Sequence, residues 1–303
     1  MIAKKRKKRN RNWQLFFAIV LYACCLYKII TNLSFTVENL QNTVFSFLNE
    51  VFFYRLFSIF LLTINTIALV FVMRRQEMVE LRNYIPAVCY LLLSFIFSDC
   101  LNPLALFAGL VFIVGIFRNL FDLEEHNINQ KMFQHSFCVG ILTLIYFPFI
   151  ALLLFACLSG IIYRRMNFRI FCLSIMGVFL PVLYWYSTLY VIGYDFSLSN
   201  DIQLSAERLL HFQFFNIIET PFTLIVSILL ILTGLKSMHK LWTASGKTSV
   251  LRRKKYYILM VLLLFSIGLT FLYSQFYMEI TLLAYSIVLS LQIKFSTLSA
   301  PPQ

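Results

Sequence analysis

The feature that most limits the fold is a series of long apolar runs. One of them, residues 170–192, reads IFCLSIMGVFLPVLYWYSTLYVI and contains no charged side chain. A transmembrane helix needs about 20 apolar residues, within a range of about 17 to 25. By that measure the sequence predicts ten spans, at residues 13–31, 52–73, 83–98, 102–117, 133–147, 148–163, 170–192, 220–235, 257–274 and 278–293. The fold class we predict is all-α, a polytopic membrane helix bundle in a single membrane domain, 1–303.

The composition agrees with a membrane protein. Hydrophobic residues make up 60% of the chain and charged residues only 13%, whereas a soluble domain carries roughly 25% charged residues. A soluble protein with a very apolar core would not contain so many runs of this length. The first run follows a basic N-terminal segment, and we expect it to be an uncleaved signal anchor.

The basic residues fall between the apolar runs in a pattern that predicts the topology. With the N-terminus inside, 23 of the 26 basic residues lie in cytoplasmic segments, chiefly a tail at 1–12 and a loop at 236–256. Only Lys28, Arg55 and Arg208 remain outside. The positive-inside rule therefore predicts that both termini are cytoplasmic. Because the charges are not gathered on one groove-facing surface, we expect no nucleic-acid partner.

Two outer segments are long enough to have structure of their own. In residues 32–51, apolar side chains recur at spacings of three and four, and most of the polar ones fall on the other face. This pattern is typical of an amphipathic helix lying in the membrane interface. The second segment, the outer loop 193–219, begins with polar turn residues. Its later part is predicted to form a short helix.

Spans three and four, and again five and six, are predicted as short hairpins. Each arm has only about 15 residues and reaches about 22 Å, less than a hydrocarbon core of about 30 Å. The turn FSDCLNP, residues 97–103, joins the first pair, and Asn102 and Pro103 have the residue types favoured at a helix start. Asp99 either caps this turn in solvent or lies in a sunken funnel, where non-helical backbone is tolerated beside a wet cavity.

The middles of the ten predicted spans contain no charged residue. Ionisable residues inside spans usually mark ion or proton pathways, so their absence counts against a proton- or voltage-coupled transporter. Lys28 and Arg55 lie near outer span ends, where long side chains can reach the interface. A carrier of a lipid or apolar substrate stays compatible with this pattern. Glu279 belongs to the outer side in this topology.

The polar residues that could do chemistry gather on the outer side. We predict two carboxylates, Asp99 and Glu219, as catalytic residues. The predicted substrate-binding residues are Arg55, Arg208, His211 and Glu38. Acids for general-base work, with an arginine and a histidine that can meet a phosphate, suit chemistry on a polyprenyl-phosphate-linked substrate. The layout is similar to that of membrane glycosyltransferases that use lipid-linked sugars, but this is an analogy of layout.

Residues 81–186 carry a family resemblance. The residues that carry it are LRNYIPAVCYLLLSFIF, LNPLALFAGLVFIVGIFRNLFDLEE, FQHSFCVGILTLIYFPFIALLLFACLSGIIYRRMNFRIF and GVFLPVLYWY. This part of the chain resembles a family of uncharacterised multi-pass inner-membrane proteins from Bacteroidetes bacteria. The resemblance implies a bacterial inner (cytoplasmic) membrane location and lends no established activity.

Some relatives in that family have been labelled carotene oxygenases, and the histidines of this chain disagree with that label. A membrane iron oxygenase needs several histidine ligands on one side. The four histidines here are scattered along the chain and do not share a side of the predicted topology: His126, His135, His211 and His239. We therefore expect no metal or other cofactor.

Three functional hypotheses follow, and they imply different partners besides the lipid bilayer. In the first, the protein handles or modifies a lipid-linked cell-envelope precursor at the periplasmic face. In the second, it is a non-catalytic scaffold of an envelope complex, and small residues allow close approach of partner helices: Gly109, Gly115, Gly140 and Gly160. In the third, it transports an apolar or lipid substrate.

Overall fold

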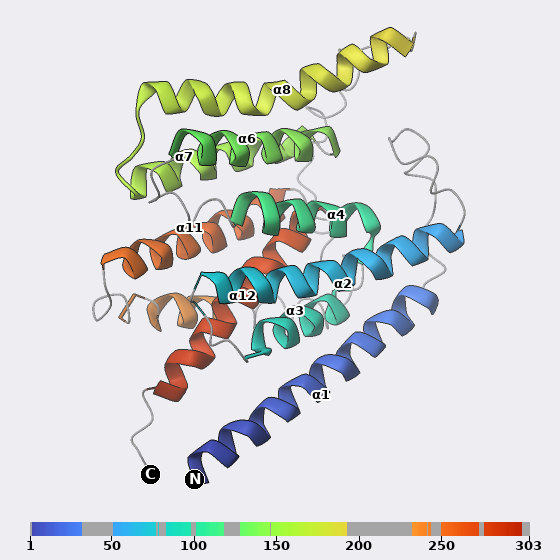
Figure 1. The fold of residues 1–303 in the computed structure, drawn as a ribbon, viewed down its shortest axis with the longest axis vertical. Helices are drawn as coiled ribbons and strands as arrows, with labels where there is room; N and C mark the ends of the chain where they lie inside the picture. The colour runs from blue at the N-terminus through green and yellow to red at the C-terminus, as the bar shows by residue number, and fades with distance from the viewer. Residues whose placement is uncertain are drawn as a thin grey trace.

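The computed structural model describes residues 2–31, 51–76, 78, 83–97, 101–117, 128–145, 147–192, 232–240, 242–243, 250–272 and 276–298. Every regular element in these ranges is a helix (Figure 1). The first half contains α1 (Ile2–Thr31), α2 (Val51–Arg75), α3 (Ile85–Ile96), α4 (Pro103–Val111) and the π-helix η4 (Phe112–Phe117). The second half contains α6 (Ile128–Ile145), the short η5 (Phe147–Ala151), α7 (Leu152–Ile162), α8 (Phe168–Ile192), α11 (Val250–Leu272) and α12 (Phe276–Leu298). The all-α fold class is thus confirmed.

Three of these helices are long and apolar enough to cross a membrane. They cover Asn12–Thr31, Phe53–Arg75 and Phe168–Val191. Four shorter apolar helices accompany them, at Ile85–Ile96, Pro103–Gly115, Phe149–Ile162 and Glu279–Leu291. Three of the four predicted short arms are thus short helices, and the fourth, predicted at 133–147, is part of the longer α6. Of the predicted interfacial helix 32–51 only the last residue is described, and the outer loop 193–219 lies outside the described residues.

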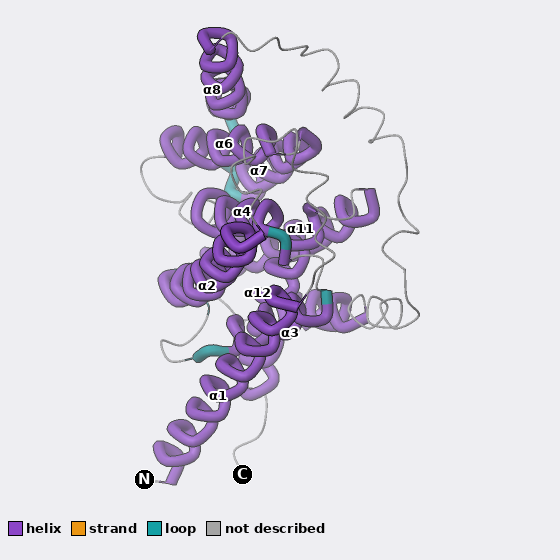
Figure 2. The backbone as a smooth tube through the Cα atoms, turned by 90° about the vertical axis from the view of Figure 1, so that its right-hand side faces the viewer, coloured by secondary structure: helices purple, strands orange, loops and turns teal. Residues whose placement is uncertain are grey.

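The helices are stacked in successive layers. Figure 2, a view from the side, shows α8 at one end of the stack, then α6 and α7, and α1 at the other end. The centre consists of α2, α3, α4 and α12: α2 packs against α3 and α4, and α12 packs against the same two helices. On the far side of this centre α1 contacts α3, while α11 joins α12 to α7. The buried apolar residues form one continuous cluster through these layers.

The α3–α4 hairpin begins and ends as its local sequence predicts. Asn102 is the N-cap of α4, its side-chain oxygen accepts a hydrogen bond from the Leu104 backbone N–H at 3.1 Å, and Pro103 opens the helix. Both residue types suit these positions because the cap satisfies a free N–H and proline has none to lose. The same Asn102 oxygen accepts a hydrogen bond from the Tyr54 hydroxyl of α2 at 3.0 Å. The predicted start of α4 is confirmed.

The four glycines of the scaffold hypothesis are buried within the chain's own bundle. Gly109 faces α2 and α12, Gly115 faces Cys138 of α6, Gly140 faces Val178 and Pro181 of α8, and Gly160 faces Met166. They permit close packing of helices inside this chain. They therefore do not form the free small-residue surface that the hypothesis assigns to a partner.

Basic residues cluster at helix ends on one side of the molecule. Arg74 and Arg75 end α2, Arg169 lies in the first turn of α8, and the run 252–255 lies in the first turns of α11. Figure 1 shows these three helix ends, and the start of α1, on the left side of the bundle. Lys255 donates a hydrogen bond to the Gln76 side-chain oxygen at 3.0 Å, which ties the end of α2 to the start of α11.

Candidate functional site

A carboxyl group lies in the middle of the central helices. Glu279, in the first turn of α12, is 0% exposed, and its Oε1 accepts a hydrogen bond of 2.5 Å from the Tyr90 hydroxyl of α3. Tyr90 is itself 0% exposed. A buried charge or polar group needs partners to offset its lost hydration, and this tyrosine provides one.

Two further polar side chains adjoin the same pair. Asn65 of α2 and Ser94 of α3 both lie beside the Tyr90 hydroxyl, and both are 0% exposed. Ser94 is on the same face of α3 as Tyr90 because residues four apart in a helix lie one turn above each other. The Asn65 amide nitrogen donates to the Leu106 carbonyl of α4 at 2.8 Å. We call Asn65, Tyr90, Ser94 and Glu279 the Glu279 cluster.

Gly109 of α4 makes room for the cluster. A Cβ atom at this position would lie 2.9 Å from Glu279 Cγ, 3.0 Å from Glu279 Oε1 and 3.2 Å from Asn65 Nδ2. The backbone of α4 therefore lies directly against the carboxyl and the amide. A glycine is required here by this close approach.

Several oxygens of the cluster lack a hydrogen-bond partner within the described part of the chain. These are Glu279 Oε2, Asn65 Oδ1 and Ser94 Oγ. Most buried polar atoms in folded proteins are paired, so an unpaired carboxyl oxygen with two further unpaired oxygens in the same cluster calls for an explanation. No basic side chain in the described ranges bonds to Glu279, and its only recorded hydrogen bond is the one from Tyr90.

The depth of this cluster corrects a sequence-based placement. Asn65 lies near the middle of the apolar helix Phe53–Arg75, about 15 Å or more from either end at about 1.5 Å per residue. Glu279 and Asn65 both lie against Gly109 of α4. Glu279 is therefore about as far from the ends of α2 as Asn65 is. Its assignment to the outer side was wrong because hydropathy places the start of every span at the surface, whereas α12 begins inside the bundle. The interior thus contains an ionisable residue after all.

Only one of the predicted site residues can be placed. Arg55 lies near the start of α2 and is partly exposed, next to the buried Tyr54 that reaches Asn102. The other five, which are Asp99, Glu219, Arg208, His211 and Glu38, fall outside the described residues. Their predicted roles stay predictions.

Lys28 does not simply extend toward the membrane surface. Its Nζ donates a hydrogen bond of 2.7 Å to the Phe95 carbonyl, in the last turn of α3, and lies 4.4 Å from the centre of the Phe95 ring. A cation at a helix C-terminus is favoured by the helix dipole. Lys28 therefore fastens α1 to the end of α3.

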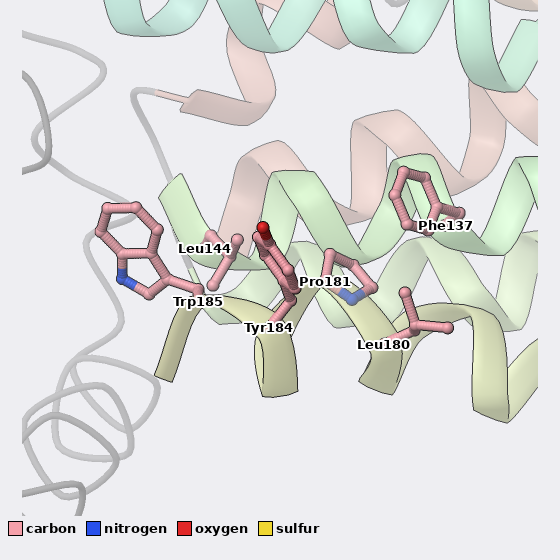
Figure 3. A pocket seen from close by; sticks show the side chains of 6 residues that line it. All are labelled: Phe137, Leu144, Leu180, Pro181, Tyr184 and Trp185. Carbon is pink, nitrogen blue, oxygen red and sulfur yellow. The ribbon is translucent and has the colours of Figure 1, made fainter. Parts of the chain in front are cut away.

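A groove between α6 and α8 has a different character. It has a volume of about 340 Å³ and is lined by Phe137 and Leu144 of α6 together with Leu180, Pro181, Tyr184 and Trp185 of α8. Figure 3 shows these six side chains gathered along the two helices. The lining is apolar except for the Tyr184 hydroxyl and the Trp185 indole N–H.

In the described ranges no group of three or more His, Cys, Asp or Glu side chains converges that could hold a metal ion.

The Glu279 cluster was missed by sequence reasoning, although two signals for it were present. Asn65 is an amide in the middle of a predicted span, and Tyr90 and Ser94 have helical spacing within another.

Comparison with known proteins adds no assignment. No protein-family model matches the chain, and neither a curated protein nor a solved structure matches it significantly. The helix bundle and the Glu279 cluster are therefore the basis for any functional conclusion.

Proposed function

We propose that this chain is a multi-pass membrane transport protein in which a cation binds at and leaves Glu279. The observation that carries the proposal is the fully buried carboxyl of Glu279, which lies beside the middle of the long apolar helix α2 and has no basic partner among the described residues. An ionisable group at such a depth is costly and usually serves an ion pathway or a proton relay. A purely structural role is served equally well by an apolar side chain.

The membrane arrangement of the proposal rests on helix length and charge. Three helices can cross a bilayer, and the basic ends of α2, α8 and α11 lie on one side of the bundle. By the positive-inside rule this side is cytoplasmic. We place the protein in the bacterial inner membrane, as the family resemblance of residues 81–186 implies.

The test is chemical modification of the carboxyl followed by a flux measurement. An apolar carbodiimide reaches carboxyl groups within a membrane and modifies them when they are protonated. We expect it to label wild-type protein at Glu279, as located by peptide mass spectrometry, and to leave the Glu279→Gln variant unlabelled at that position. In proteoliposomes, cation flux should be present in the wild type and lost in Glu279→Gln.

A matched control separates loss of function from loss of fold. Ser286 lies on the same helix and is also 0% exposed, but its hydroxyl donates to the Leu283 carbonyl within the helix. The Ser286→Ala variant should keep wild-type flux. A wild-type protein that is never labelled, together with unchanged flux in Glu279→Gln, contradicts the proposal.

Chemistry on a lipid-linked precursor is a second candidate, favoured by the gathering of acids in the predicted outer segments. It predicts that Asp99→Asn and Glu219→Gln abolish function in cells at normal protein level, whereas Glu279→Gln has little effect. The transport proposal predicts the reverse order. Co-purification with another membrane protein in mild detergent is the result that the scaffold hypothesis requires.

A further inference from the structure

The cation of the Glu279 cluster can be identified from the packing and the hydrogen bonds around the carboxyl. We propose that this cation is a proton, which binds reversibly to Glu279 inside the bundle. The inference rests on the proposed function and names the ion that the carboxyl binds and releases. Glu279, Tyr90 and Asn65 come from three helices, α12, α3 and α2, and each is 0% exposed.

The first observation is that the carboxyl is tightly enclosed on the side of α4. Even the Cβ atom that Gly109 lacks would lie only 2.9 Å from Glu279 Cγ and 3.2 Å from Asn65 Nδ2. A metal ion needs a shell of ligands: calcium takes about six to eight oxygens, and magnesium usually keeps several waters. A proton needs no such shell and occupies almost no volume. The close packing therefore favours a proton over a metal ion.

The second observation is the number of hydrogen-bond donors in the cluster. The Tyr90 hydroxyl donates its hydrogen to Glu279 Oε1 at 2.5 Å. The Ser94 hydroxyl and the Asn65 amide both lie beside the Tyr90 oxygen, and each has a hydrogen to donate to it. Glu279 Oε2 remains, and a proton turns this oxygen into a donor, for which Asn65 Oδ1 is an acceptor in the same cluster. A protonated Glu279 therefore needs no metal ion beside it.

The third observation is that the surroundings favour both charge states of the carboxyl. Burial without a counter-charge favours the neutral form, and no basic side chain of the described ranges bonds to Glu279. The exposed N–H groups at the start of α12 and the hydrogen bond from Tyr90 favour the ionised form. These opposing effects are what a site needs if it is to release its proton as well as hold it.

The titratable side chains around Glu279 carry no fixed charge. Besides Tyr90 of α3, Cys25 of α1 is buried and interacts electrostatically with Glu279. The titratable residues of α2 lie near its two ends, α4 has none, and α11 has none after Tyr257. On α12 itself, Tyr285 faces Gly234. Tyrosine and cysteine are ordinarily uncharged near neutral pH, so Glu279 is the group of this cluster whose charge changes.

The first experiment detects the proton on the purified full-length protein in detergent. Infrared spectroscopy at a series of pH values measures the C=O band of protonated carboxyl groups. Wild type should show a band that Glu279→Gln lacks, and this band should disappear as the pH is raised. Ser286→Ala is the matched control, because its hydroxyl is already paired within α12, and it should keep the wild-type band. The absence of this band from the wild type, or a band that does not change with pH, overturns the proton proposal.

A second measurement keeps the test valid if Glu279→Gln folds poorly. Tyr90→Phe removes the donor that favours the ionised form, so the band should disappear at a pH about one unit higher than in the wild type. This is a tenfold change in proton affinity, equivalent to about 1.4 kcal/mol. Tyr285→Phe, at another buried tyrosine, should leave the titration unchanged. Equal shifts in the two variants, or no shift in Tyr90→Phe, overturn the proposal.

Flux into proteoliposomes separates a failure of this inference from a failure of the proposed function. A pH-sensitive dye sealed inside the vesicles reports proton entry, and radioactive sodium and rubidium report the entry of monovalent metal ions. Acidification that depends on Glu279 supports both proposals. Entry of sodium or rubidium that depends on Glu279, without a change in pH, overturns only the proton proposal. If no flux depends on Glu279 but the infrared band titrates, only the proposed function is overturned; if the band is absent as well, both are overturned.

Discussion

The close approach of Gly109 to the Glu279 cluster allows one prediction to be worked out in detail. In Gly109→Ala the added Cβ would lie 2.9 Å from Glu279 Cγ, whereas ordinary contact begins at 3.4 Å, so about 0.5 Å (3.4 − 2.9) must be gained by movement. Neither neighbour moves easily, because Tyr90 holds the carboxyl and Leu106 holds the Asn65 amide. Overpacking of this kind costs about 1–3 kcal/mol. The gain in helix propensity offsets up to about 1 kcal/mol.

We therefore expect Gly109→Ala to lower the free energy of unfolding by about 1–2 kcal/mol. The measurement is unfolding by SDS in mixed micelles, followed by far-ultraviolet circular dichroism. Gly160→Ala is the matched control: its Cβ would lie 3.0 Å from Met166 Sδ, the far end of a flexible side chain that can move at little cost. That variant should be as stable as the wild type or slightly more stable.

A double variant identifies the contact responsible. Glu279→Ala removes the atoms that the Cβ added in Gly109→Ala would meet at 2.9 and 3.0 Å. In that background the additional cost of Gly109→Ala should fall by about 1 kcal/mol, as expected for residues in direct contact. Equal stability of the Gly109→Ala and Gly160→Ala variants, or costs that simply add in the double variant, would refute the close packing on which the reasoning depends.

Three further substitutions test other contacts through the free energy of unfolding. Asn102→Ala should lower the free energy of unfolding by about 1 kcal/mol because α4 loses its N-cap. Asn102→Ser can still cap the helix and should lower it less. Equal losses in the two variants would contradict the capping role. Lys28→Met should lose about 1 kcal/mol because the end of α3 loses a hydrogen bond, and an unchanged value would show that the bond contributes nothing. Tyr90→Phe should lower the free energy of unfolding by about 1–3 kcal/mol because it leaves a buried carboxyl oxygen without its donor. Tyr285→Phe, at another buried tyrosine, should lower it less. The opposite order would be inconsistent with the hydrogen bond from Tyr90 to Glu279.

Local sequence patterns predicted the parts of the fold that depend on neighbours along the chain. The start of α4 could be located at Asn102 and Pro103 because capping involves only residues two or three apart. Runs such as 170–192 predicted helices because an apolar helix needs nothing but length and composition. These properties are contained within one segment.

The position of Glu279 depends on the packing of several segments and could not be predicted in the same way. Hydropathy shows where apolar residues begin along the chain, but not whether a helix begins at the membrane surface or inside the bundle. The contacts of Glu279 with Tyr90 and with Gly109 are what show that this acid lies inside the bundle. Similarly, the four glycines are typical of close helix contacts, but the pattern does not say whether the neighbour belongs to the same chain.

The hydrogen bonds between α2 and α4 restrict how the cluster can be opened. Asn102 Oδ1 accepts from Tyr54 at the start of α4, and Asn65 donates to Leu106 one turn farther along it. Sliding or rotation of α2 against α4 would break both bonds. The two helices should therefore behave as one rigid wall. A path for an ion to Glu279 then requires α3 or α12 to swing away from that wall, so the moving side of the protein is the one that carries the carboxyl and its tyrosine.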